Sequence, residues 1–212
     1  MRLKNCELNV INVTFVFQDL NRDYISRDHI RGIVDDKPII TDLPDVLVVI
    51  YPQQEIQAIF EGRRVMVNLA VRPEVSYDVD MLASIAIGVL NSVKGSNLVA
   101  YGFNFHGAGQ LEGIQDVGSY FKNKFFREQA ELESAFGSIF SVAPRFGLRG
   151  SAYDINVSLE PHDNNPSGFG FHFNFHKNRP AIPNVEQLGD EMRSTKGLIK
   201  ELLEKYKGAS EQ

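Results

Sequence analysis

Alternation of apolar and polar residues is clearest in residues 168–176, which read Gly-Phe-Gly-Phe-His-Phe-Asn-Phe-His. Successive side chains of a strand point to opposite faces. All four phenylalanines therefore share one face, and the other face carries Gly170, His172, Asn174 and His176. The pattern predicts a strand with one aromatic packing face and one small or polar face.

Residues 98–106 show the same alternation and end in Phe103-Asn104-Phe105-His106. The same four-residue motif ends the run at residues 168–176. Asn104 and His106 share the polar face of this second predicted strand. The repeated motif has two explanations. It indicates either a duplicated architecture or two strands that neighbour each other in one sheet.

Further strand patterns, rich in β-branched and aromatic residues, occupy residues 8–17, 46–51, 56–60, 65–71, 139–148 and 152–160. Helical spacing predicts helices over residues 79–94, 115–134 and 184–207, with a short one around residues 24–33. Asn184 and Gln187 stand in capping-box positions at the start of the last helix. Residues 107–114 are glycine-rich and are predicted as a connection, because their glycine spacing does not match a phosphate-binding loop.

The predicted order is strand, connection, three strands and helix, followed by strand, helix, three strands and helix. This order favours an α+β protein of two similar halves, residues 1–95 and 96–212, fused into one compact duplicated unit. Each half is expected to pack its helices on one face of an antiparallel sheet. Whether the halves share one sheet or form two stays open at this stage.

Composition narrows the class of protein. With 43% hydrophobic and 23% charged residues the chain is typical of globular proteins. A net charge of -5 without a basic block argues against nucleic-acid binding. A single cysteine, Cys6, and no run of about eighteen apolar residues predict a cytoplasmic protein without a membrane span.

The polar faces of the two Phe-Asn-Phe-His strands hold the candidate ligand-binding residues, which are Asn104, His106, His172, Asn174 and His176. His172 and His176 would lie about 13 Å apart in a strand, too far to bind one metal ion together. A metal site would need His106 with one of them. No metal site, cofactor or catalytic constellation is predicted, and the Gly-x-Ser-x-Gly motif is absent.

These observations favour a non-enzymatic binding or protein-interaction module, with self-association through strand edges or the last helix as one form of interaction. Two alternatives stay open. The first is a carrier that holds an apolar small molecule in a phenylalanine-lined cavity. The second is a metal-dependent enzyme that uses His106 with His172 or His176.

Overall fold

The computed structural model describes residues 3–72, 77–126, 128–139, 141–178 and 181–208. Its strands are β1 (Leu3–Phe17), β2 (Ile39–Asp42), β3 (Val46–Tyr51), β4 (Ile56–Glu61), β5 (Arg64–Ala70), β6 (Leu98–Leu111), β7 (Arg145–Arg149), β8 (Asp154–His162) and β9 (Asn165–Asn178). Its α-helices are α1 (Arg27–Arg31), α2 (Val79–Asn91), α3 (Val117–Phe125), α4 (Gln129–Phe136) and α5 (Val185–Gly208). Short 3-10 turns lie at Arg22–Tyr24 and Pro52–Gln54.

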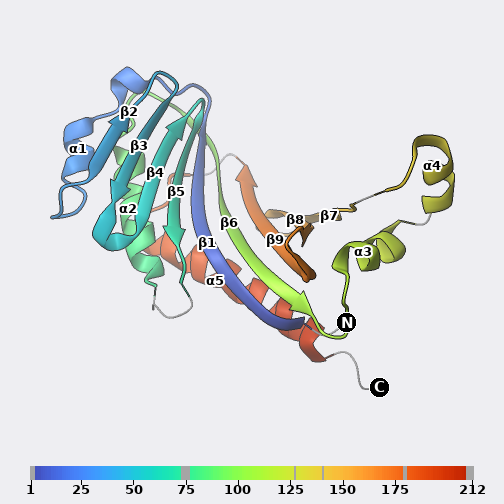
Figure 1. The fold of residues 1–212 in the computed structure, drawn as a ribbon. Coiled ribbons are helices and arrows are strands. Elements are labelled where there is room, and N and C mark those ends of the chain that lie inside the picture. Colours follow the sequence, from blue (N-terminus) through green and yellow to red (C-terminus); the bar gives the residue numbers. More distant parts are fainter. Residues whose placement is uncertain (1–2, 73–76, 127, 140, 179–180, 209–212) are drawn as a thin grey trace.

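Within the described residues the nine strands form one antiparallel sheet in the order β2-β3-β4-β5-β1-β6-β9-β8-β7. The predicted α+β class is confirmed. The long strands β1 and β6 pair at the centre of the sheet and join the segments predicted as two halves (Figure 1). The question left open by the sequence is therefore answered, because both segments share one sheet.

The two Phe-Asn-Phe-His motifs lie on neighbouring strands. β6 and β9 pair so that Asn104 faces Asn174, while His106 faces His172. The side chains of Phe169, Phe171, Phe173 and Phe175 are at most 4% exposed. The predicted aromatic packing face of this strand is therefore confirmed as part of the hydrophobic core.

Helices cover this apolar face. α2 contacts β4 and β5, α5 contacts β1 and β6, and the two helices contact each other. Figure 1 shows both of them behind the sheet. The opposite face, called the open face below, carries the other set of alternating side chains. No helix within the described residues is long and apolar enough to cross a membrane.

Polar contacts fix both the start and the position of α5. The predicted capping box is confirmed, since the Gln187 amide donates to Asn184 Oδ1 at 2.8 Å and the Asn184 amide donates to Gln187 Oε1 at 3.1 Å. Further along the helix, Glu191 accepts hydrogen bonds from Tyr101 Oη and Lys177 Nζ, both at 2.7 Å. These bonds tie α5 to β6 and β9.

The prediction of a glycine-rich connection at residues 107–114 was wrong, because β6 continues to Leu111. Gly107 and Gly109 face Phe171 and Phe169 across the strand pair. A Cβ atom added to Gly107 would lie 2.3 Å from the Glu7 carbonyl oxygen and 2.2 Å from the Phe171 ring. Gly107 therefore makes room for an aromatic ring and for close backbone approach.

Other boundaries also differ from the predictions. The helix predicted over residues 115–134 is divided into α3 and α4, because Phe126 has an extended backbone. The strand predicted over residues 139–148 begins only at Arg145, and the helix predicted around residues 24–33 is a 3-10 turn followed by the short α1. The edge strand β2 was not predicted, since its four residues give too short a pattern.

The close approach at Gly107 makes a testable prediction. Gly107→Ala should destabilise the protein by about 1–3 kcal/mol, because backbone and an aromatic ring must shift to admit the methyl group. Gly170→Ala is the matched control on the neighbouring strand, where an added Cβ has its nearest neighbours at 3.9 Å. Urea unfolding of both variants measures the difference, and equal stability of the two would contradict this account.

Candidate functional site

A row of asparagines crosses the open face. Five adjacent strands each contribute one asparagine, and the pairing register places them side by side. The row, called the asparagine ladder below, consists of Asn68, Asn12, Asn104, Asn174 and Asn156. Polar amide side chains thus line up across five neighbouring strands at the centre of the sheet.

The asparagine ladder is hydrogen-bonded head to tail. Asn156 Nδ2 donates to Asn174 Oδ1 at 3.3 Å, and Asn174 Nδ2 donates to Asn104 Oδ1 at 2.8 Å. Asn104 Nδ2 donates to Asn12 Oδ1 at 2.8 Å, and Asn12 Nδ2 donates to Asn68 Oδ1 at 2.6 Å. Asn12 is only 6% exposed, so its polar atoms need these partners. Each bond fixes the orientation of the next amide.

Two histidines stack beside the asparagine ladder. The rings of His106 and His172 lie 4.2 Å apart between centroids and 6° from parallel. His172 Nε2 lies 2.9 Å from Asn104 Oδ1. Because a carbonyl oxygen can only accept, Nε2 carries the proton and Nδ1 is left as an acceptor in the neutral ring. The asparagine ladder thereby selects one tautomer of His172.

Both histidines are neutral at neutral pH. Burial, together with charge repulsion from the nearby His106 and Arg145, lowers the pKa of His172 from its ordinary 6.5 to about 4. Burial also lowers the pKa of His106. The pair therefore offers polar nitrogen atoms and flat ring surfaces, and carries no positive charge.

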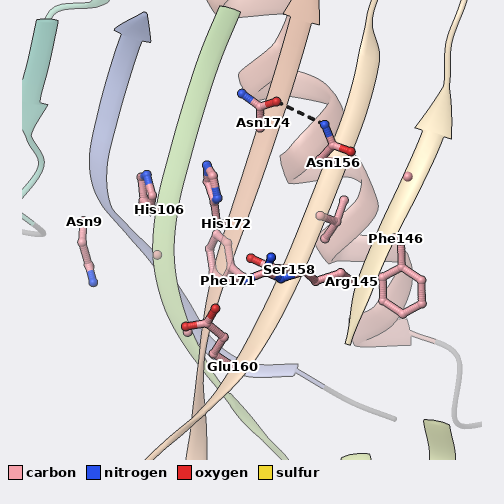
Figure 2. Close-up of a pocket in the computed structure, with 14 residues that line it drawn as sticks. Asn9, His106, Arg145, Phe146, Asn156, Ser158, Glu160, Phe171, His172 and Asn174 are labelled. Carbon is pink, nitrogen blue, oxygen red and sulfur yellow. Dashed lines mark hydrogen bonds between the residues drawn. The ribbon is translucent and has the colours of Figure 1, made fainter. Parts of the chain in front are cut away.

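A hollow of about 630 Å³ lies next to the histidine pair (Figure 2). Its floor is low at Gly170, which has no side chain and pairs with Glu160 at the far side. Figure 2 shows the side chains of His106, His172 and Glu160 around this space. The absence of a side chain at Gly170, with larger side chains around it, thus produces the hollow.

The hollow has one side chain of each charge. Arg145 and Glu160 both line it, and no ion pair joins them within the described residues. Ser158, two residues before Glu160 on β8, faces Arg145 on one side and His172 on the other. The site therefore combines a guanidinium donor, a carboxylate acceptor, a hydroxyl and an imidazole acceptor.

The structure brings together four of the five residues proposed from the sequence. His106, His172 and Asn174 line the hollow, and Asn104 holds two of them by hydrogen bonds. His176 lies on the same face but is paired with Gly102 and Asp154, and it does not line the hollow.

Sequence reasoning missed the contributions of Arg145, Ser158 and Glu160, and also three members of the asparagine ladder. One signal could have identified the asparagine ladder. Each of its five asparagines is flanked by two apolar residues, as in Ile11-Asn12-Val13. An amide inside an apolar strand needs a partner, and five such strands can supply one another.

Geometry gives little support to metal binding by the histidine pair. Ring nitrogens direct their lone pairs in the ring plane, so parallel stacked rings do not aim two lone pairs at one point. Among the residues that the structure describes, no group of three or more His, Cys, Asp or Glu could hold a metal ion.

No protein-family model matches the chain, and the search of curated proteins also found no match.

The low pKa of His172 predicts how stability depends on pH. The unfolded chain binds a proton at His172 below pH 6.5, whereas the folded protein resists it down to about pH 4. The stability that depends on neutral His172 is therefore complete above pH 6.5 and is lost as the pH falls towards 4. Urea unfolding at pH 7 and pH 4.5 should show a larger loss for the native chain than for His172→Gln. An equal loss would contradict the assignment.

Proposed function

We propose that the protein is a non-enzymatic binding protein and that a small polar molecule occupies the hollow on its open face. One observation carries the proposal. Polar side chains of different chemistry converge from β6, β7, β8 and β9 on one hollow, and the asparagine ladder orients His172 and Asn174 among them. Pre-oriented groups bind a ligand without first losing their own conformational freedom.

The lining indicates the ligand's chemistry. Arg145 suits a carboxylate or phosphate group, since its guanidinium forms paired hydrogen bonds with such anions. Glu160 and His172 Nδ1 suit hydrogen-bond donors of the same ligand. A molecule with an anionic end and a donor-bearing end, of the size of an amino acid, satisfies both ends of the hollow.

Binding is favoured over catalysis because the described residues around the hollow form no activated nucleophile. Ser158 lies opposite His172, and a serine nucleophile with a histidine base would require such a pair. No hydrogen bond joins their side chains within the described residues, and the low pKa of His172 makes it a weak base at neutral pH. These features support a site that holds a ligand unchanged.

The two alternatives from the sequence have weaker support. An apolar carrier needs an enclosed cavity under the phenylalanine face, but Phe169 to Phe175 are themselves packed, and the apolar space beside them is lined by the exposed Leu148. A metal-dependent enzyme would need His106 to converge with His172 or His176, but the rings of His106 and His172 are stacked in parallel and His176 pairs with Gly102, four residues away from His106 on β6.

We also propose that residues 1–95 and 96–212 are structural repeats. The strand order supports this proposal. In the first half β1 lies beside β5, and β4, β3 and β2 follow towards one edge of the sheet. In the second half β6 lies beside β9, and β8 and β7 follow towards the other edge. Each half also ends with a helix, α2 or α5. Opposite handedness of the two chain paths on superposition would refute the duplication.

The binding proposal predicts thermal stabilisation by small zwitterionic molecules. A panel of free amino acids and their phosphorylated forms, tested by thermal unfolding at millimolar concentration, should contain compounds that raise Tm by several degrees. Gly170→Val should abolish the shift, because the site can accept a β-carbon and the side chain would fill the hollow. Arg145→Gln should weaken binding about tenfold or more.

Arg149→Gln is the matched control for Arg145→Gln, because Arg149 lies on the same strand and the same face but does not line the hollow. It should leave the Tm shift intact. An unchanged response of folded Gly170→Val to every active compound would overturn the proposal.

A further inference from the structure

The backbone of β7 faces outwards at alternate residues. The Gly150 amide donates to the Tyr153 carbonyl at 2.9 Å, and the Leu159 amide donates to the Pro144 carbonyl at 3.0 Å. In an antiparallel pair, hydrogen-bonded residues alternate with residues that point away from the partner strand. The amides and carbonyls of Arg145, Gly147 and Arg149 therefore point to the free edge of the sheet, and no backbone partner meets them within the described residues.

The two faces of β7 differ in chemistry. Phe146 and Leu148 point to the helix side, where they are 40% and 55% exposed. They line an apolar groove of about 380 Å³ together with Phe125 of α3 and Leu202 of α5. On the open face, the side chains of Arg145 and Arg149 flank Gly147. The edge thus presents two arginines around a glycine on one face and two apolar side chains on the other.

The charges argue against a second copy of the chain as the occupant. A symmetric antiparallel pair of two β7 strands, centred at Gly147, would place Arg145 of one copy opposite Arg149 of the other. Like charges directly opposite each other destabilise a strand pair. Arg149 also interacts with Asp154 at 3.7 Å, but both side chains are exposed and this pair neutralises little.

We propose that β7 binds an extended acidic peptide segment as an additional strand of the sheet. The segment carries acidic side chains opposite Arg145 and Arg149, and apolar side chains opposite Phe146 and Leu148. Backbone hydrogen bonds supply affinity in such strand addition, and alternate side chains supply specificity. Acidic residues pair with the arginines on the open face, while the apolar residues enter the groove on the helix side. The partner is thus a protein segment, distinct from the small ligand of the hollow.

A short labelled peptide tests the inference on the full chain. The probe has the core Glu-Leu-Thr-Leu-Glu between short polar flanks, and it reads the same in both directions, so it fits parallel or antiparallel pairing. Fluorescence anisotropy should show saturable binding that weakens as the salt concentration rises. The Lys-Leu-Thr-Leu-Lys peptide and a version with N-methylated backbone amides should each bind at least about tenfold more weakly.

Variants of β7 locate the binding. Arg145→Glu with Arg149→Glu should weaken the acidic peptide by about tenfold or more and should strengthen the lysine peptide. Gly147→Pro removes an outward amide that β8 does not use, so the protein should stay folded by circular dichroism while binding is lost. Stronger binding of the lysine peptide by the variant with Arg145→Glu and Arg149→Glu shows that this variant is folded.

Two results would overturn the inference. Equal affinity for the acidic and lysine peptides would show that charge pairing with β7 is absent, as expected for a groove that binds only apolar groups. A dimer in sedimentation that is lost in Gly147→Pro would show that a second copy occupies the edge. Gly170→Val separates this inference from the proposed function, since it fills the hollow and should leave peptide binding unchanged.

Discussion

Hydrogen bonding among five asparagines is the constraint on which the open face of this protein depends. A slip of one residue between any two strands moves every side chain to the opposite face, which would bury amides in the core and expose phenylalanines. The asparagine ladder is satisfied in only one register, because each amide donates to the next across five strands. The same register places His106 beside His172, so the geometry of the candidate site follows from strand pairing.

The sheet separates two kinds of chemistry. Its helix side is packed with aromatic and β-branched residues, and Phe103 and Phe105 there are fully buried. Its open side combines the asparagine ladder with a hollow, whose floor is low because Gly170 has no side chain. The outer strand β7 borders both sides, since Phe146 lines the apolar groove and Arg145 lines the hollow. The two proposed binding surfaces, which differ in chemistry, therefore meet at one edge of the sheet.

Sequence patterns predicted the fold well where the period was long and regular. The alternation around Phe173 and Phe175 identified both a strand and its buried face, and the capping box at Asn184 identified the start of α5. The patterns failed where local composition misled. Gly107 indicated a loop, but its glycine is explained by the ring of Phe171 on a neighbouring strand, which is a contact that local sequence does not contain.

Prediction of the candidate site was partial for a similar reason. A repeated Phe-Asn-Phe-His motif and the alternation around it identified Asn104, His106, His172 and Asn174. Arg145 on β7 and Glu160 on β8 come from strands whose place in the sheet depends on the complete strand order. Their charges were visible in the sequence, but their convergence on one hollow was not, since it arises from pairing between segments far apart in the chain.

The protonation site of His172 tests most directly whether the asparagine ladder organises the open face. Long-range nitrogen NMR at pH 7 distinguishes the two neutral tautomers of an imidazole. The account predicts a neutral ring protonated at Nε2, because Asn104 Oδ1 accepts from that nitrogen. A ring that exchanges freely between the two tautomers, or one that is protonated at Nδ1, would contradict it.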